Sequence, residues 1–162
     1  MKNKISIIPL FLIVVIFISS PKINAQLVTK KTVSLELAKK LATAAEEQAI
    51  KDNLTVVISI VDDGGNLVYL EKMDGTQLGS IEISMKKAKT AISFKRPTKA
   101  YQDRIAGGTN AIIALKNVLP FEGGLPLLVD GELVGAIGVS GGTSEQDGVI
   151  ANAAVELLNS IK

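Results

Sequence analysis

The segment that most restricts the fold of this chain is a strand that runs directly into a helix near the carboxyl end. An apolar run from Leu133 to Val139 continues into the short turn Ser140 to Gly142, and a helical pattern starts at Thr143. Glycine lets the backbone turn sharply, because it has no Cβ to clash. Thr143 and Gln146 have the spacing of a capping box, in which the two side chains bond reciprocally to backbone N–H groups. The sequence therefore predicts a tight strand-to-helix connection here.

The amino end of that helix admits two interpretations. Its free N–H groups and the positive end of its dipole attract anions, which makes the turn a candidate ligand seat. An ordinary capped turn without a ligand has the same sequence pattern. An acidic side chain from Glu145 or Asp147 would also satisfy the dipole and would repel an anion. The motif marks a position and leaves the ligand open.

The first 25 residues have the pattern of a secretory signal peptide. Lys2 and Lys4 give a basic start, Ile5 to Ile18 is almost wholly apolar, and Ile23 to Ala25 resembles a small-residue cleavage site. This pattern predicts cleavage before Gln26. The apolar run is short for a membrane span, which needs about 20 residues. An uncleaved amino-terminal anchor is the alternative.

The predicted mature chain, residues 26–162, has the length of a single domain. We expect it to be exported to the periplasm or secreted, without stable membrane insertion after cleavage. Loss of the leader removes three lysines and no acid, so the formal charge moves from +2 to −1. This near balance argues against nucleic acid or an anionic membrane as a partner.

Two of the residue types that the chain lacks, cysteine and histidine, restrict its chemistry. The chain has no cysteine, so burial rather than disulfide bonding must supply the stability of an exported domain. It has no histidine, so no imidazole can act as a base or bind a metal. Triads of the Ser-His-Asp type, zinc sites with histidine and haem sites with a proximal histidine are therefore excluded.

Hydrophobic periodicity and turn residues predict the order of elements. We expect helices over Ser34 to Asp52, Ser80 to Phe94, Thr98 to Ala106 and Thr143 to Ile161. We expect strands over Gln26 to Val33, Thr55 to Asp62, Leu67 to Met73, Leu127 to Asp130 and Leu133 to Val139. Asn110 to Val118 fits a short helix or an irregular turn, and Pro120 to Pro126 reads as a loop. Two hairpins with helices before, between and after them predict an α+β fold, in which helices pack on an antiparallel sheet.

Helical spacing also predicts which side chains face the core. In the second helix the apolar face is expected to hold Ile81, Met85, Ala88 and Ile92. Its outward face is expected to hold Lys86, Lys87 and Lys89. In the last helix, the inward positions are Val149 and Ala153, or alternatively Ile150 and Ala154, together with Leu157 and Leu158.

Three segments in this order resemble the GlcG/HbpS-type haem-binding (haem-degrading) domain family. They are VVISIVDDGGNLVYLEKMDG, QLGSIEISMKKAKTAISFKRPT and FEGGLPLLVDGELVGAIGVSGGTSEQD, and the similarity covers Val33 to Ile161. The resemblance implies a central antiparallel sheet flanked by helices, a profilin-like layered sandwich. It also implies symmetric homo-oligomers, from dimers to octamers. Some exported members bind haem, and one branch senses redox state with a partner histidine kinase.

Three loops carry the family pattern: Lys95 to Thr98, Phe121 to Gly124 and Ser140 to Thr143. If they meet, two helix amino ends and one guanidinium surround a pocket that suits a carboxylate, such as a haem propionate or a small organic acid. Arg96 is the expected cation because its fork matches a carboxylate, and a salt bridge with Glu122 or Asp147 is the alternative. The candidate ligand-binding residues are Arg96, Thr98, Glu122, Gly123, Gly124, Gly141, Gly142 and Thr143.

The resemblance to the haem-binding branch also implies a threonine hydroxyl as the axial ligand of haem iron, which points to Thr98. The alternative is that Thr98 caps the helix that follows Pro97. The other side chains of types that ligate haem iron are Met73, Met85, Tyr69 and Tyr101. Ligand pockets are usually richer in aromatic residues than this chain, so composition gives little support for tight capture of haem.

Three functions fit these observations. The first is an exported haem- or tetrapyrrole-binding protein that acts as a sensor, buffer or scavenger. The second is a small-molecule enzyme that acts on an organic acid or degrades haem, with Glu122, Glu145 or Asp147 as general acid or base. The third is an oligomeric interaction module without catalysis.

Overall fold

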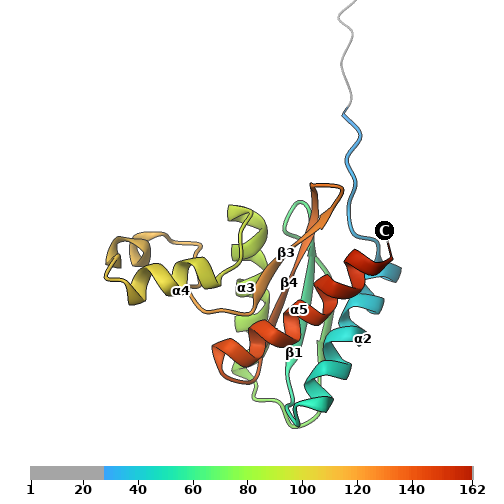
Figure 1. The fold of residues 1–162 in the computed structure, drawn as a ribbon, viewed down its shortest axis with the longest axis horizontal. Coiled ribbons are helices and arrows are strands. Elements are labelled where there is room, and N and C mark those ends of the chain that lie inside the picture. Colours follow the sequence, from blue (N-terminus) through green and yellow to red (C-terminus); the bar gives the residue numbers. More distant parts are fainter. Residues whose placement is uncertain (1–27, 162) are drawn as a thin grey trace, which may run out of the picture.

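The computed structural model describes residues 28–161, and the predicted signal peptide lies outside them. The described chain forms three layers (Figure 1). Helices α2 (Leu35–Lys51) and α5 (Ser144–Ser160) cover one face of a sheet, and α3 (Gly79–Phe94) covers the other. Helix α4 (Lys99–Ala106) and the 3₁₀ helix η1 (Asn110–Ala114) project from the side of the body. None of the helices in this range is both long and apolar enough to cross a bilayer.

The sheet has four strands in the order β2-β1-β4-β3, and all neighbours are antiparallel. The strands are β1 (Val57–Asp62), β2 (Leu67–Lys72), β3 (Gly124–Val129) and β4 (Glu132–Ser140). Each hairpin therefore supplies one inner and one edge strand. The two inner strands, β1 and β4, join the two halves of the sequence. This arrangement confirms the expected α+β fold with a central antiparallel sheet flanked by helices.

Local signals explain the turns and helix starts. Asp130 and Gly131 have φ values of 52° and 78°, as the tight two-residue turn between β3 and β4 requires. The Ser34 hydroxyl accepts a hydrogen bond from the Leu37 N–H at 3.2 Å and starts α2. Thr143 caps α5 with the reciprocal Gln146 contacts of the predicted capping box. These elements form where the sequence patterns predicted them.

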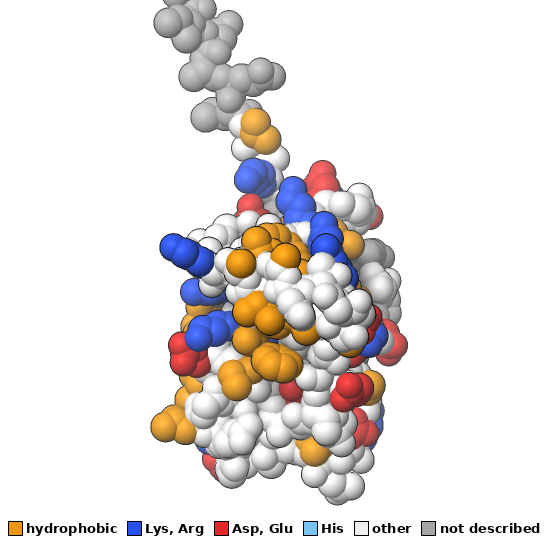
Figure 2. All heavy atoms as spheres, turned by 90° about the vertical axis from the view of Figure 1, so that its left-hand side faces the viewer, with side chains coloured by type: hydrophobic (Ala, Val, Ile, Leu, Met, Phe, Trp, Pro, Cys, Tyr) orange, Lys and Arg blue, Asp and Glu red, His pale blue; other side chains and the backbone are white. Residues whose placement is uncertain are grey.

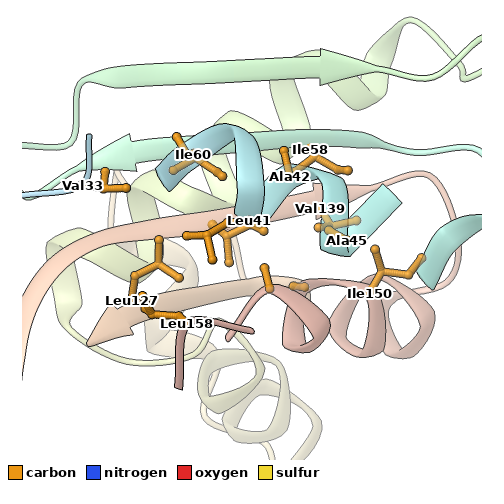
Figure 3. Packing of buried hydrophobic residues seen from close by; sticks show 14 of the residues in the cluster. Val33, Leu41, Ala42, Ala45, Ile58, Ile60, Leu127, Val139, Ile150 and Leu158 are labelled. Carbon is orange, nitrogen blue, oxygen red and sulfur yellow. The ribbon is translucent and has the colours of Figure 1, made fainter. Parts of the chain in front are cut away.

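The main core lies between the sheet and the helices α2 and α5 (Figure 3). The residues Leu41, Ala42 and Ala45 of α2 point toward Ile58 and Ile60 of β1. The alanines let the helix approach closely, and the branched side chains of the strand fill the space between them. The other face of the sheet carries a smaller cluster: Val61, Ala88, Ala91, Ile92 and Ala136.

Helix α3 lies almost directly on the backbone of β4. A Cβ added to Gly138 would lie 2.1 Å from the Ser84 carbonyl oxygen. Only glycine permits that approach. The Ser84 hydroxyl lies 2.7 Å from the Ser59 hydroxyl of β1, and both serines are fully buried. This polar contact explains why α3 buries small and polar side chains where an apolar stripe was expected.

Two expected elements differ from the structure. The expected strand over Gln26 to Val33 is wrong in its described part, where Val33 makes a single backbone bond to the Val134 carbonyl at 2.9 Å. Strand β3 begins at Gly124, inside the expected loop. Proline lacks an N–H, and Pro126 is tolerated in β3 because this strand lies at the edge of the sheet. The ambiguous segment after α4 forms η1 and then continues irregularly.

The structure also corrects the expected orientation of Lys87 on α3 and decides between the two alternatives for the inward face of α5. Lys87 was expected to point outward, but it is one of the most deeply buried side chains of α3, with 2% exposure. In α5 the inward positions are Ile150 and Ala154, while Val149 is 55% exposed. The second of the two alternatives for α5 is therefore the observed one.

Candidate functional site

The three predicted loops meet at one corner of the molecule, which we call the glycine corner: Lys95–Thr98, Phe121–Gly124 and Ser140–Thr143. Thr98 donates its N–H to the Gly124 carbonyl at 2.9 Å, and Gly124 donates its N–H to the Thr98 hydroxyl at 2.9 Å. Val139, at the end of β4, donates its N–H to the Gly123 carbonyl at 2.8 Å. The structure thus brings together loops that are far apart in the sequence.

A buried ion pair occupies the centre of the glycine corner. The Lys87 ammonium lies 2.6 Å from Asp147 Oδ2, and the two side chains are 2% and 4% exposed. Lys87 also donates to the Val139 carbonyl at 2.9 Å, and Asp147 Oδ1 accepts from the Gly142 N–H at 2.9 Å. Burial lowers the pKa of Lys87 and raises that of Asp147, and their mutual attraction opposes both changes. The pair joins α3, β4 and α5.

The second loop packs so closely against Lys87 that its two positions 123 and 124 have no room for a side chain. Gly123 has a φ of 116°, and an added Cβ would lie 2.8 Å from the Lys87 ammonium and from the Val139 oxygen. A Cβ on Gly124 would lie 2.5 Å from the Lys87 carbonyl oxygen. The loop therefore packs onto Lys87 without side chains of its own.

Three N–H groups at the amino end of α5, those of Gly142, Thr143 and Gln146, are bonded within the chain. Gly142 donates to Asp147 Oδ1 at 2.9 Å, as described above. Thr143 donates its N–H to Gln146 Oε1 at 2.9 Å, and the Gln146 N–H reaches the Thr143 hydroxyl at 3.3 Å. This arrangement favours the capped turn over an anion seat, because the chain's own carboxylate and amide take the donors that an anion would use.

Thr98 is fully buried, and its hydroxyl faces the second loop. In addition to accepting from Gly124, it lies 3.4 Å from the Gly124 carbonyl oxygen. Thr98 occupies the N-cap position of α4, as the alternative expected, but its side chain makes no capping bond there. An iron atom could reach this oxygen only if the loop moved away. The geometry favours Thr98 as a positioning residue for Gly123 and Gly124.

Arg96 is exposed and lies at the outer side of the glycine corner. Its guanidinium carbon is 5.9 Å from the centroid of the Tyr101 ring, and its Nε donates to the Phe94 carbonyl at 3.2 Å. Neither alternative partner contacts it: Asp147 pairs with Lys87, and Glu122 Oε2 lies 3.2 Å from the Lys99 ammonium. The cation–π contact holds the guanidinium over the ring of Tyr101 in α4.

Glu122 is the candidate acid with the fewest hydrogen bonds. Its Oε2 is buried and makes no hydrogen bond within residues 28–161, although Lys99 lies close enough for an ion pair. A Cβ on Gly148 would lie 2.5 Å from Glu122 Oε1, so α5 leaves room for this carboxylate. Glu145 is exposed at the start of α5. Of the three candidate acids, only Asp147 is locked into a buried pair.

The remaining candidate haem donors serve other contacts. The Met73 sulfur accepts from the Val56 N–H at 3.4 Å, and the Tyr69 hydroxyl donates to Glu71 at 2.9 Å. Tyr101 is 3% exposed and packs edge-on against Phe94, with the ring centroids 5.6 Å apart. Met85 is half-buried on α3. In the described part of the chain, no three acidic side chains gather as a metal site would require.

A second feature was not predicted from the sequence. It is an open cavity of about 600 Å³ beside the part of α3 toward its carboxyl end. We call it the lysine cavity. Its walls come from the β1–β2 turn, from the carboxyl half of α3 and from the segment after η1. The lining residues are Gly64, Gly65, Lys86, Lys89, Thr90, Ser93, Lys116, Asn117, Val118 and Leu119.

The fold defines an α+β domain with helices on both faces of a four-stranded antiparallel sheet. A family model described as haem degrading protein HbpS-like matches residues 33–156, so the chain belongs to this family. Protein GlcG of Escherichia coli K12 is 39% identical over 112 residues, which cover 69% of this chain and 84% of GlcG. These findings confirm the family resemblance found in the sequence motifs.

Solved structures give the same result. Protein ORFY of Klebsiella pneumoniae has a TM-score of 0.78 and 33% identity, over 86% of this chain and 99% of that protein. The structure of a PduOC:heme complex has a TM-score of 0.71 and 36% identity, over 77% of this chain and 94% of PduOC. The domain architecture is therefore shared with a protein whose structure contains haem.

Proposed function

We propose that this chain is an exported haem- or tetrapyrrole-binding protein of the GlcG/HbpS type, which acts as a sensor, buffer or scavenger. The observation that carries the proposal is the similarity to PduOC, which forms a haem complex and shares 36% of its residues with this chain over the matched region. Membership of a family described by haem chemistry supports it independently.

The lysine cavity offers charge partners for the propionates of haem but no strong ligand for its iron. The two propionates of haem are anionic, and the lysine cavity presents three lysines and no acidic residue. The iron prefers His, Cys, Met or Tyr, and no residue of these types lines the cavity. We therefore expect binding through the propionates and the macrocycle, with at most a weak oxygen donor from this chain. Such a complex exchanges haem readily, as a buffer or sensor requires.

Titration of the purified chain with haemin tests the proposal. We expect a sharp Soret band that saturates at one haem per chain. Transfer of the bound haem to apomyoglobin should be fast, because no strong axial ligand from this chain retains the iron. Broad absorption that grows in proportion to added haemin, as with any apolar surface, contradicts the proposal.

Export is the second part of the proposal, and it is supported by the basic, apolar and small-residue order of the first 25 residues. Expression of the full chain with a carboxyl-terminal tag, followed by fractionation and intact-mass measurement, tests it. We expect a product outside the cytoplasm that begins at Gln26. A full-length product in the membrane would identify the uncleaved anchor, and a full-length cytoplasmic product would contradict export.

Homo-oligomer formation is the third part, and the segment of α4 and η1 supports it. Ile113 and Leu115, at and after η1, are 70% and 45% exposed, and Phe121 is 51% exposed. Figure 2 shows the side from which this segment projects, with hydrophobic side chains gathered near its middle. Light scattering should give more than one chain per particle, and Ile113→Glu should reduce the size. Ile50→Glu, at an exposed position of α2, is the matched control.

Haem degradation is a second candidate function, favoured by the description of the matching family. Glu122 is the acid in the glycine corner whose Oε2 lacks a hydrogen bond within the described residues. If the chain degrades haem, absorbance of the bound haem should fall over repeated turnovers in the presence of a reductant and dioxygen, and Glu122→Gln should slow the loss. A stable haem spectrum under these conditions contradicts degradation and leaves the binding role in place.

A further inference from the structure

The lysine cavity is built by segments that are distant in sequence and held together by a buried side chain. Thr90 of α3 is 1% exposed. Its hydroxyl accepts from the Leu119 N–H at 3.0 Å and lies 3.3 Å from the Asn117 carbonyl, to which it donates. The segment that returns from η1 is thereby fixed against α3. The wall that carries Lys116 is part of the folded body.

A second wall is a single face of α3. Lys86, Lys89 and Ser93 are spaced at i, i+3 and i+7, so their side chains lie on one stripe of the helix. The β1–β2 turn closes one end of the cavity with Gly64 and Gly65. Two lysines on one wall therefore share the cavity with a lysine on the other.

The positive charge of this cavity is only partly compensated by the chain. Lys86 pairs with Glu82, one turn away on α3, at 2.9 Å. Lys89 and Lys116 have no carboxylate within 4.0 Å among residues 28–161. Of the two acids at the β1–β2 turn, Asp62 directs its carboxylate to the Gly64 and Asn66 N–H groups, and Asp63 lies 3.8 Å from the Lys30 ammonium. Like charges that line a concave surface repel one another and attract an anion with more than one charge.

Neutral donors are also available in the cavity. The Ser93 hydroxyl and the Asn117 amide make no side-chain hydrogen bond within the described residues, and both side chains are exposed to the cavity. Val118 and Leu119 add apolar surface beside them. The volume of about 600 Å³ is typical of sites for small organic ligands. The composition of the walls is that of a polar, cationic site with a small apolar part.

We propose that the lysine cavity binds a small molecule with at least two anionic groups, which Lys89 of α3 and Lys116 of the segment after η1 contact. Two sources of this chemistry are the paired propionates of haem and a free polycarboxylic acid. The identification of the bound anion as haem rests on the proposed function, whereas the anion site itself does not. The glycine corner is a weaker candidate for the seat of the anions, because the N–H groups of Gly142, Thr143 and Gln146 are already bonded within the chain.

The test compares two double variants of equal charge in the mature chain. Lys89→Gln with Lys116→Gln removes the two unpaired cations of the cavity. Lys39→Gln with Lys51→Gln removes two exposed lysines from α2 on the other side of the sheet and is the control. Both pairs are exposed, so both variants should fold, and thermal unfolding confirms this before binding is measured. The probes are haemin, haemin dimethyl ester, which lacks the two anionic groups, and citrate.

For the cavity variant we expect haemin affinity to fall on the order of tenfold, and for the control less than about twofold, as two exposed charge pairs predict. The dimethyl ester should bind the parent chain more weakly than haemin and should not distinguish the variants. Citrate binding, measured by calorimetry, should fall in the cavity variant alone if a free polycarboxylate is the source. The affinity that depends on Lys89 and Lys116 should fall as the salt concentration rises, for haemin and for citrate alike.

The outcomes separate the two proposals. Equal affinity of both double variants for haemin and for citrate overturns the anion site and leaves haem binding in place. If the parent chain binds citrate in a manner that depends on Lys89 and Lys116 but does not bind haemin, the anion site stands and the haem function is wrong. Failure of the parent chain to bind any probe overturns both.

Discussion

Lys87 and Lys89 lie two residues apart on α3, yet they belong to regions of opposite character. Lys87 is buried in the glycine corner, where Asp147 and the Val139 carbonyl satisfy it. Lys89 lines the open lysine cavity and has no ion pair among the described residues. In the glycine corner the charged side chains pair with each other inside the fold, whereas in the lysine cavity they are exposed to solvent. The difference shows that the function of a cation in this chain depends on which side of α3 it occupies.

The strongest test of this comparison is Lys87→Met, which leaves Asp147 buried without its cation. We expect the free energy of unfolding to fall by about 3–5 kcal/mol, because an unpaired buried charge is far more costly than a paired one. Urea denaturation measures it. Lys89→Met is the control and should change stability by no more than about 0.5 kcal/mol. Equal losses in the two variants would remove the distinction between the two regions.

The next largest effect is expected from Gly123→Ala. The φ of 116° is strained for any residue with a Cβ, and the added carbon would lie 2.8 Å from the Lys87 ammonium. We expect a loss of about 3 kcal/mol in the free energy of unfolding. Gly79→Ala, at the start of α3, is the matched control because a Cβ there meets nothing within 4 Å. A neutral Gly123→Ala would show that the corner has room to relax.

Thr98→Val distinguishes the positioning role from the predicted role as an axial ligand. Loss of the hydroxyl leaves the buried Gly124 N–H without a partner, so we expect a loss of about 1–3 kcal/mol in stability. Thr98→Ser keeps the oxygen and should lose less. If Thr98 only positions the loop, the haem spectrum of the folded variant will match that of the parent chain. A shifted spectrum would support iron ligation by Thr98.

The smallest effect concerns Asp62, which holds the turn at one end of the lysine cavity. Burial raises its pKa, but hydrogen bonds from Asn66 and Gly64 lower it more, so the net pKa lies below the ordinary value of 3.8. Its stabilising contribution is therefore complete above 3.8 and is lost as the pH falls through the lower folded pKa. Urea denaturation from pH 5 to pH 2 should show Asp62→Asn losing this pH dependence, with a difference below about 1 kcal/mol.

Asp74→Asn, at an exposed position in the turn after β2, is the control for that measurement. It should keep the acid dependence of the parent chain. If both asparagine variants behave alike, the carboxylate of Asp62 does not fix the wall of the cavity.

The features that sequence analysis predicted are those with local signals. The capping box of Thr143 and Gln146, the two-residue turn at Asp130 and Gly131, and the end of the second helix at Phe94 each depend on a few neighbouring residues, and each is present in the structure. The meeting of the three loops was the condition on which the hypothesis of a ligand site depended, and the structure brings them together. The family and the α+β fold followed from these patterns.

The features that were missed depend on contacts between distant residues. Nothing in the local pattern separates Lys87 from Lys86 and Lys89, since its partner Asp147 is 60 residues away. The lysine cavity needs Thr90 to hold the segment around Asn117, which again is a contact between separated parts of the chain. A helical stripe predicts which residues share a face, but it does not predict what covers that face.

The strand order has a consequence for how the chain is made. Strand β1 is central in the sheet, but its inner neighbour β4 ends at Ser140, close to the carboxyl terminus. Until β4 leaves the ribosome, one edge of β1 has no hydrogen-bonding partner, and α3 lacks the strand on which it packs. The nascent polypeptide therefore cannot complete its sheet before this last described strand has emerged, and contacts of such long range form slowly.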